Sequence, residues 1–495
     1  MLTYIHILHY FSKKSSTFFI FNSYLTFEIQ KDENTLERAC FQSQKGVFML
    51  SYINTFLSGL AVPILLGAAG IFYGIKLKFF HIFKPSAVIA GLKGDGKKSG
   101  VSSAKAVALA LAGTLGVGNI VGVSSAIHLG GFGAVFWMWI SALVAMILKY
   151  AEIVLAIKYR ETRPDGSYEG SAMKYICAFF TSIGFKRAGR VVSGLFAVLF
   201  LVNALTMGSM LQSGAVAEAL HGTVGLPKLY IGMCLAVVTF FTLRQGTDAL
   251  TKITGALVPF MSVGYVIISL AVIISNRGEL GDALGLIVRS AFDKNATVAG
   301  VGGYAFITSL RYGVMRGLIS NEAGCGTAPT AHAIANCTHP AKQGMWGIFE
   351  VFADTILLCT MTALCVILEY GEAARYGGNY MMMTLSAYSA SLGDAAAYFL
   401  AAAVTCFGVA TVLCWSHYGL SAALTFGGGR KTKNAFLLTY CACVALGSVV
   451  SSEFAWELAD ISMAIMIIIN LTVICFMWRE VRKETDDFLV LRKTK

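Results

Sequence analysis

The sequence predicts an all-α integral membrane protein with 11 transmembrane helices, ten of them arranged as two inverted sets of five. Hydrophobic residues make up 56% of the 495-residue chain and charged residues only 13%, which is far more apolar than a soluble domain. Two long apolar segments are interrupted near their middle by glycine and polar residues. Basic residues gather in alternate connections between the apolar segments, the pattern that orients helices in a membrane.

Residues 1–48 differ in composition from the rest of the chain. They contain one glycine, Gly46, and a mixed-charge run at 31–38. Their apolar stretch, 18–27, is too short to cross a membrane, and it lacks the small-residue cleavage site of a signal peptide. Met49 directly precedes the first long apolar segment. We therefore expect residues 1–48 to be a disordered or mis-started N-terminal extension.

Residues 49–480 contain the apolar segments, each close to the length that a transmembrane helix needs. They lie at about 53–75, 104–128, 131–157, 189–216, 228–245, 252–275, 302–335, 344–368, 395–425, 434–452 and 455–478. The segment 53–75 stands apart as an extra N-terminal helix. The first set of five occupies 104–275, the second occupies 302–478, and residues 481–495 form a tail.

The distribution of Lys and Arg orients these segments. Between residues 76 and 105 the chain carries seven lysines against Asp95 alone. The connections 158–190 and 429–433 and the C-terminal tail are also basic, whereas 276–301, 369–394 and 453–457 are neutral or acidic. Because basic loops stay in the cytoplasm, we expect a multi-pass protein of the cell membrane with its N-terminus outside and its tail inside. The two sets of five then enter the membrane from opposite sides.

The first broken segment, 104–128, is interrupted by Gly113, Thr114, Gly116, Gly118 and Asn119. Glycine lets the backbone leave and rejoin a helix, and non-helical backbone at membrane depth occurs where it is buried in protein or lines a water-filled cavity. The freed carbonyl groups can coordinate a cation, and the amides of the restarting helix can bind a carboxylate. The alternative is helix packing alone, through Gly118 and Gly122 at small-xxx-small spacing.

The second broken segment, 302–335, is interrupted by Asn321, Glu322, Gly324, Gly326 and Pro329. An intramembrane carboxylate such as Glu322 is costly unless it is paired or solvated, so it is a functional candidate. Its alternative, which we favour over direct contact with a substrate ammonium group, is an ion pair with Arg311 or Arg316 that locks the break. We expect the thiol of Cys325 to be reachable from water in at least one conformation. Interrupted helices in matching places of two halves are typical of secondary transporters, so we interpret residues 49–480 as a transporter domain.

The third helix of each set supplies further polar groups. Gln212 in the first set and Thr411 and Trp415 in the second occupy corresponding places, and Thr411 and Trp415 lie four residues apart on one helical face. A threonine hydroxyl beside the carbonyl groups of a broken helix suits a hard cation, so we expect sodium near Gly116, Asn119 and Thr411. Trp415 would wall a small apolar side chain or, alternatively, face lipid.

Other features of the sequence exclude several classes of function. Asp354 lies in an apolar segment and implies a polar partner or an ion path. The 12 cysteines are scattered, and we interpret them as buried apolar residues. The sequence has no Walker loop, HExxH motif or nucleophile elbow, so neither ATP hydrolysis nor covalent catalysis is indicated. The formal charge of +12 gathers in loops, which indicates membrane orientation and not nucleic-acid binding. We expect no cofactor besides the coupling ion.

Two long motifs carry a resemblance to a known family. They are GTLGVGNIVGVSSAIHLGGFGAVFWMW at 113–139 and SNEAGCGTAPTAHAIA at 320–335, supported by QSGAVAEAL (212–220), FADTILLCTMTA (352–363) and ATVLCWSHYG (410–419). These segments resemble the alanine/glycine:cation symporters, the sodium:alanine symporter family. The resemblance implies a leucine-transporter-like five-plus-five inverted repeat with one extra N-terminal helix, which imports a small neutral amino acid together with sodium.

The family's roles fall on matching residues of this chain. They are Gly118 and Asn119, Gln212, the SNEAG stretch at 320–324 with Asn321, Glu322 and Gly324, and Thr411 with Trp415. Four positions depart from the family's usual residues: Phe132 in place of Pro, Gly214 in place of Asn, Ala410 in place of Ser, and Leu420 in place of an acidic residue. Ala410 removes one hydroxyl that could bind the cation. Such changes could shift the preference among alanine, glycine, serine and glutamine.

Three other functions stay open on the sequence. A proton-coupled transporter would use Glu322 or Asp354 as its titrating group. An ion channel would need a continuous polar lining and no coupling of ion to substrate. A membrane-embedded enzyme would need a nucleophile and a base, and we find no such pair in the sequence.

Overall fold

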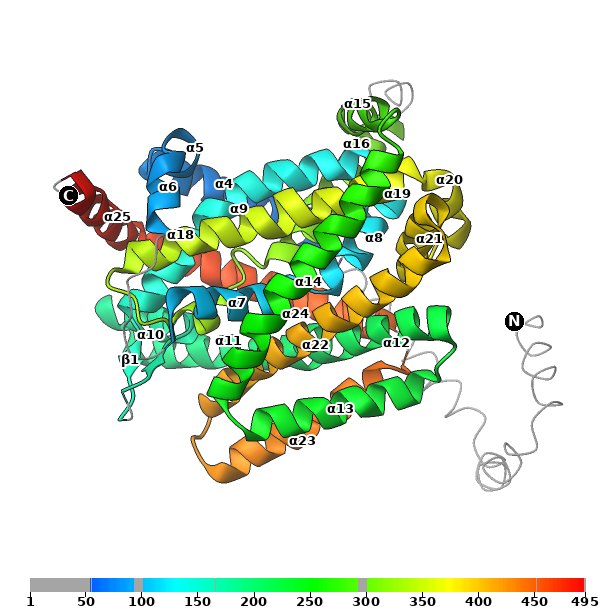
Figure 1. Cartoon of the computed structure of the whole chain (residues 1–495). Helices are drawn as coiled ribbons and strands as arrows, with labels where there is room; N and C mark the ends of the chain where they lie inside the picture. Colours follow the sequence, from blue (N-terminus) through cyan, green and yellow to red (C-terminus); the bar gives the residue numbers. More distant parts are fainter. Residues whose placement is uncertain are drawn as a thin grey trace, which may run out of the picture. The chain divides into compact units, whose positions relative to one another are not determined.

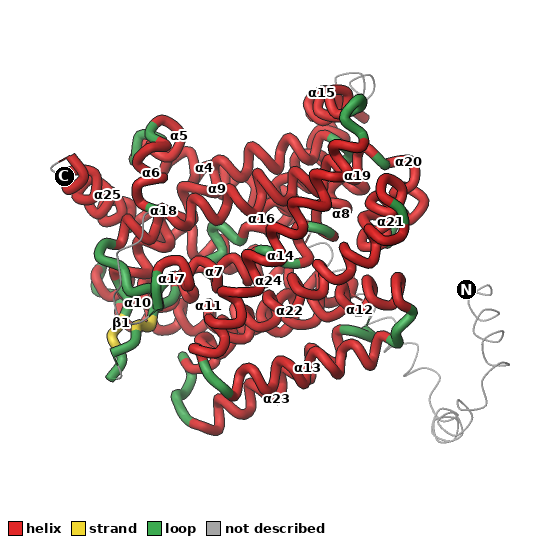
Figure 2. The backbone as a smooth tube through the Cα atoms, viewed as in Figure 1, coloured by secondary structure: helices red, strands yellow, loops and turns green. Residues whose placement is uncertain are grey.

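The computed structural model describes residues 54, 56–92, 101–164, 166–292, 301–450 and 452–493. This part of the chain is almost wholly helical (Figures 1 and 2). Its strands are β1 (Glu161–Thr162) and β2 (Tyr168–Glu169), which pair antiparallel with Glu161 opposite Glu169. The predicted extension, residues 1–48, lies outside the described residues.

Six described helices are long and apolar enough to cross a membrane. They are α9 (Gly133–Lys158), the α11–η3–α12 run (Lys186–Val224), α14 (Thr247–Ser275), the α18–η5–α19 run (Pro340–Leu368), α22 (Asp394–Leu424) and α24 (Ser452–Phe476). A seventh crossing is added if the bent pair α7 (Ser103–Thr114) and α8 (Val121–Gly130) forms one span. Membrane-spanning helices therefore dominate the fold, as predicted.

Four further segments that the sequence predicts to span are also helical. They are α4 (Val62–Lys76), α13 (Lys228–Arg244), α16 (Val301–Asn321) and α23 (Arg430–Gly447). Each is shorter or less apolar than the six above, so the total of 11 spans and the extra N-terminal helix stay predictions. Shorter helices join the long ones: η1 (Leu57–Ala61), α5 (Phe80–Phe83), α6 (Pro85–Gly91), α10 (Ala172–Ser182), α15 (Leu280–Ala291), α20 (Tyr370–Ala373), η6 (Ala374–Tyr376), α21 (Tyr380–Leu392) and α25 (Trp478–Lys493).

Both predicted helix breaks are present. The chain leaves α7 at Thr114, forms the single turn η2 (Val117–Asn119), and resumes as α8 at an angle of 58° to α7. The second break separates α16 from α17 (Ala328–His332). Within it Gly324 and Gly326 have φ values of +83° and +76°, which only glycine adopts without steric cost. Helix α16 stops at Asn321, where the next residue, Glu322, already has a φ of +53°, and the two glycines continue the non-helical segment.

Helix α9 is the most enclosed of the six long helices. Its apolar window is 83% buried, compared with 39% for that of α14. It packs along α16 on one side and α18 on another, and α18 runs beside it in Figure 1. Polar side chains on α9 are therefore placed against the second break and against α18, and not against lipid.

Two π-helical stretches border the first break. The first, η3 (Thr206–Met210), joins α11 to α12, and the second, η5 (Phe352–Cys359), joins α18 to α19. Stretches of this kind occur frequently at functional sites. Gly208 of η3 packs on Trp415, where a Cβ would overlap the indole. Through Gly208, η3 thus brings the third helices of the two sets into contact beside the broken helix, whereas η5 lies in the second helix of the second set.

Close helix crossings depend on glycine. At Gly447, the last residue of α23, a Cβ would overlap the backbone of Met210 at the η3–α12 junction. We expect Gly447→Ala to force the two helices apart and to destabilise the protein by about 1–3 kcal/mol, the usual cost of overpacking. The control is Gly255→Ala in α14, where a Cβ meets nothing within 4 Å. Thermal unfolding of the purified variants checks this, and equal melting temperatures would contradict it.

Candidate functional site

A cavity of about 620 Å³ leads to the first break. Its inner wall includes Gly113, Gly116 and Gly118 from the break and Gln212 from α12. Apolar side chains of η3, α12 and α8 complete the wall, namely Met207, Leu211 and Val121. The cavity therefore joins a polar stretch of backbone to an apolar surface, and its volume is ample for a small solute with one apolar group.

The mouth of the cavity lies at the end of the bundle where α12 ends and α13 begins. Lys228 and Glu218 form an ion pair there, with an N–O distance of 2.5 Å, and Asn379 donates a hydrogen bond of 2.8 Å to Glu218. Tyr380, the first residue of α21, also lines the mouth. Burial raises the pKa of Tyr380, so its hydroxyl stays protonated at neutral pH. The entrance is polar and carries both signs of charge.

Gln212 holds the backbone of the first break. Its Oε1 accepts a hydrogen bond of 3.1 Å from the amide of Val117, and its Nε2 donates one of 3.2 Å to the carbonyl of Met207. A Cβ built on Gly116 would lie 3.1 Å from the same Oε1. One predicted site residue is thus a direct partner of the broken helix.

Thr411 and Trp415 approach the same break from α22. A Cβ on Gly116 would lie 2.8 Å from Thr411 Oγ1, so glycine lets that hydroxyl approach the backbone of the break closely. Trp415 is fully buried, and its Nε1 donates a hydrogen bond of 3.4 Å to the carbonyl of Gly113. The alternative of a lipid-facing Trp415 is wrong. The structure thus places Thr411 and Trp415 beside the first break, and their role in binding stays a prediction.

Asn119 and Asp354 join the two broken helices. Asn119 Oδ1 accepts from the amide of Gly116 at 3.1 Å, and Nδ2 donates to Asp354 Oδ1 at 2.7 Å. Ser320, at the end of α16, donates to Asp354 Oδ2 at 2.8 Å. Asp354 therefore has polar partners from both breaks, and the amide of Asn119 is fully engaged in shaping the first one.

The second break is closed by side chains of α9. Asn321, Glu322 and Gly324 are buried and do not line the cavity. Lys149 Nζ donates to the carbonyl of Asn321 at 2.8 Å, and Glu152 Oε1 accepts from the amide of Gly326 at 2.8 Å. These two charged side chains, one helical turn apart, satisfy the backbone at the two ends of the break.

Two further side chains complete this closure. Asn470 of α24 donates to the carbonyl of Gly324 at 2.9 Å and to Glu152 Oε1. Tyr175 of α10 donates to Asn470 Oδ1 at 2.6 Å. The backbone of the second break is therefore held from two helices, α9 and α24, and Tyr175 of α10 positions Asn470. The first break differs from it in opening onto the cavity.

Lys149 also belongs to a buried ion pair. Its Nζ lies 3.1 Å from Glu350 Oε1 of α18, and both side chains are fully buried. Glu350 Oε2 lies 2.9 Å from His332 Nε2 of α17, and Thr114 of α7 donates to Glu350 Oε1 at 3.3 Å. The pair thus ties α9 and α18 to the ends of both broken helices.

The sequence interpretation missed these residues, although a signal was present. Lys149 and Glu152 are charged residues within the apolar segment 131–157. A charged residue inside an apolar segment is a functional candidate, by the same reasoning that singled out Glu322. Glu350 lies in the same way within 344–368.

The expectation that Glu322 forms an ion pair with Arg311 or Arg316 is wrong. The ion pairs of the described residues do not join it to Arg311 or Arg316, whose guanidinium groups lie over the rings of Tyr312 and Trp456. Glu322 Oε2 instead accepts from Thr327 Oγ1 at 2.6 Å. The side chain bonds within its own loop, with a φ of +53° at Glu322, and the cation that closes the break comes from α9.

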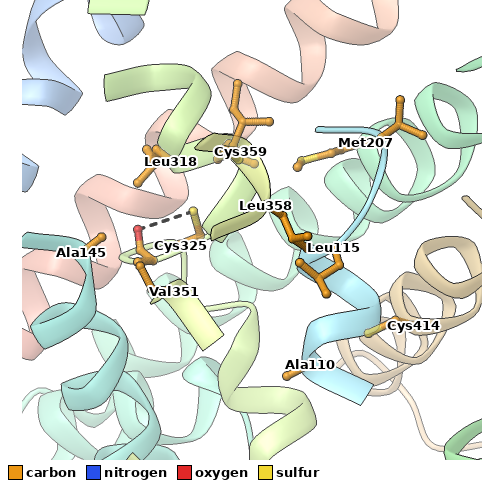
Figure 3. Packing of buried hydrophobic residues seen from close by; sticks show 14 of the residues in the cluster. Ala110, Leu115, Ala145, Met207, Leu318, Cys325, Val351, Leu358, Cys359 and Cys414 are labelled. Carbon is orange, nitrogen blue, oxygen red and sulfur yellow. Dashed lines mark hydrogen bonds between the residues drawn. The ribbon is translucent and has the colours of Figure 1, made fainter. Parts of the chain in front are cut away.

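Cys325 is fully buried in this conformation. Figure 3 shows its thiol among buried apolar side chains, with a weak hydrogen bond of 4.0 Å to the carbonyl of Ala323. It does not line the cavity. The structure therefore changes the expectation for this thiol, because the break that contains it is packed and not open to water.

Removal of one partner from a buried ion pair leaves an uncompensated charge. We expect Lys149→Met to destabilise the protein by about 3–5 kcal/mol, and the double variant Lys149→Met/Glu350→Gln to recover part of that loss. The control is Lys158→Met on the same helix. Lys158 is 28% exposed and pairs with Glu480 and Glu484, so its loss should cost about 0–1 kcal/mol. Thermal unfolding in detergent measures all three, and equal effects of Lys149→Met and Lys158→Met would contradict the account.

Comparisons with solved structures match the fold to known transporters. The chain superposes on MhsT in complex with L-phenylalanine with a TM-score of 0.53 and 13% identity, covering 77% of this chain and 89% of MhsT. It superposes on a sodium-coupled sialic acid symporter with a TM-score of 0.51 and 11% identity, covering 80% and 82% of the two chains. At such identities the likeness shows the fold alone, which is that of the leucine-transporter class.

Sequence comparisons identify the family. The chain is 32% identical to the sodium/alanine symporter AgcS of Methanococcus maripaludis, covering 91% of this chain and 98% of AgcS. It is 34% identical to the amino-acid carrier protein AlsT of Bacillus subtilis, covering 86% and 88%. It is 30% identical to a B. subtilis relative named "Probable sodium/glutamine symporter GlnT", covering 89% and 90%. The family model described as "Sodium:alanine symporter family" matches residues 44–495, and the chain therefore belongs to the sodium:alanine symporter family.

Proposed function

We propose that this protein imports alanine, glycine or both across the cell membrane, driven by a sodium gradient. The observation that carries the proposal is the close approach of two side-chain oxygens to the backbone of Gly116. A Cβ built on Gly116 would lie only 2.8 Å from Thr411 Oγ1 and 3.1 Å from Gln212 Oε1, so glycine is needed for these oxygens to come so near the break. Both oxygens thus converge on the backbone of the first break, beside a cavity that Gly116 and Gln212 line.

Sodium would bind beside these oxygens. Hard cations prefer oxygen ligands, and Thr411 donates its hydroxyl proton to the carbonyl of Phe407 at 2.9 Å, which leaves the lone pairs of Oγ1 for a cation. Gln212 Oε1 and the carbonyl groups of the break supply further oxygens. Asn119 stands beside the site, and its side chain fixes the conformation of Gly116.

The amino acid would bind next to the ion along the first break. The amides at the restart of the helix, from Gly118 onward, carry the positive end of the helix dipole and suit a carboxylate. Val121, Met207 and Leu211 would contact a small apolar side chain. Asn321, Glu322 and Gly324 support this arrangement from behind, because the end of α16 lies against Gly118, where a Cβ would lie 3.7 Å from Ser320 Cα.

The cavity supports an outward-open conformation. Its mouth is lined by Asn379 and Glu453, which lie in the connections 369–394 and 453–457 that the charge distribution of the sequence assigns to the outside. Joint binding of ion and amino acid would then favour the closed and inward-open states. A cycle that binds the amino acid in the outward-open state and releases it in the inward-open state would move it into the cell.

Radiolabelled alanine uptake into proteoliposomes tests the proposal. A sodium gradient alone should drive uptake, and a pH gradient alone should not. Unlabelled glycine should compete, and glutamine and serine should compete less. Uptake driven by the pH gradient without sodium would contradict sodium coupling, and stronger competition by glutamine would move the substrate toward that of the relative GlnT. Sodium flux that does not depend on an amino acid would indicate a channel.

Thr411→Val tests the ion site. Valine keeps the shape of threonine and removes the oxygen, so the sodium concentration for half-maximal uptake should rise by about tenfold or more, which corresponds to the loss of roughly 1.4 kcal/mol of binding free energy. Thr405→Val is the matched control, since Thr405 lies on the same helix, bonds to the carbonyl of Ala401 and is not part of the cavity. An unchanged sodium dependence in Thr411→Val would place the ion elsewhere.

A further inference from the structure

A second cavity lies on a different face of the helical bundle. It has a volume of about 450 Å³ and lies between α11, α22 and α23. Its walls are mostly apolar, and it is lined by Leu201, Leu205, Ala423, Ala435, Phe436 and Thr439, with Lys431 and Thr432 at one end. It shares no residue with the cavity at the first break.

The surroundings of this groove are those of a lipid-facing surface. Leu195 and Val198 of α11 and Leu438 of α23 are 49%, 47% and 63% exposed. Lys431 lies in the first turn of α23, where a membrane-spanning helix meets the interface. The groove therefore runs from the interface into the apolar zone, and hydrocarbon is the material that can fill it without leaving apolar walls in contact with water.

The charge at the interfacial end of the groove is positive and unopposed. Arg430, Lys431 and Lys433 follow one another closely, and residues 395–452 contain neither Asp nor Glu. Residues 186–217, which include all of α11, also lack acidic residues. The ion pairs of the described residues do not involve Arg430, Lys431 or Lys433.

We propose that this groove binds one anionic phospholipid of the surrounding membrane. Its phosphate pairs with Lys431 and accepts a hydrogen bond from Thr432, and an acyl chain lies along Leu201, Leu205 and Phe436. Basic pockets between transmembrane helices bind anionic headgroups in this way. A zwitterionic lipid offers the same chain but no net charge, so it binds more weakly.

The groove shares a wall with the helices of the substrate site. The ring of Phe436 packs 5.4 Å from that of Tyr440. The hydroxyl of Tyr440 lies 2.7 Å from the carbonyl of Val412, to which it donates a hydrogen bond, and 3.1 Å from the carbonyl of Gly208. Gly208 packs in turn on Trp415. A lipid against Phe436 supports this wall, so an anionic membrane should raise the thermal stability of the protein.

The test uses the full-length protein, purified from mixed vesicles of phosphatidylglycerol and phosphatidylcholine. Native mass spectrometry then counts the lipids that stay bound. We expect one retained phosphatidylglycerol in the wild type. Lys431→Gln should reduce its retention by about fivefold, and Ala435→Trp should abolish it by filling the groove without a change of charge. The matched control, Lys186→Gln, removes an exposed positive charge from α11 outside the groove and should retain the lipid.

Three results would overturn the proposal. Equal retention of phosphatidylglycerol and phosphatidylcholine by the wild type would mean that the site does not select charge. Equal losses in Lys431→Gln and Lys186→Gln would mean diffuse attraction to the membrane surface. A lipid-free dimer that Ala435→Trp dissociates would mean that a second copy of the chain fills the groove. Melting temperatures in each of the two pure lipids test whether Lys431→Gln is folded. A folded Lys431→Gln variant keeps the wild-type melting temperature in phosphatidylcholine, and a misfolded one does not.

Discussion

The structure depends on hydrogen bonds that satisfy the backbone groups freed where its helices break, such as the bond from Lys149 to the carbonyl of Asn321. A helix that breaks inside a membrane frees polar backbone groups that lipid cannot satisfy. At the second break the protein supplies its own charges, Lys149 for the carbonyl end and Glu152 for the amide end. At the first break Gln212 and Asn119 hold part of the backbone, and the rest faces a cavity.

This difference assigns separate roles to two sequence motifs that look alike. The backbone of the first break lines the cavity at Gly116, where we propose that solute binds. The second break is a packed support, fixed by α9 and joined to the first through Asp354, which accepts hydrogen bonds from Asn119 and Ser320. Glu350 contacts both Lys149 and Thr114, so a contiguous set of polar contacts links the two breaks.

The sequence correctly predicted the features that residues close together in the chain determine. Glycines and polar residues located both breaks, and the helical spacing of Thr411 and Trp415 placed them on one face. The partner of Glu322 was wrong because the nearest arginines in sequence, Arg311 and Arg316, are not the nearest cations in space. Lys149 lies more than 170 positions from Asn321 in the chain, and no local pattern connects them. The openness of one break and the closure of the other depend on tertiary packing, which hydropathy and charge do not encode.

Labelling of single cysteines with a membrane-impermeant thiol reagent tests this difference most directly. One variant carries Val121→Cys, on the wall of the first cavity, as its only cysteine, and the other retains only Cys325 of the second break. The account predicts that Val121→Cys reacts in proteoliposomes, that sodium with alanine slows the reaction, and that Cys325 stays unreactive with or without these ligands. Labelling of Cys325 that sodium and alanine slow, together with an unreactive Val121→Cys, would contradict it.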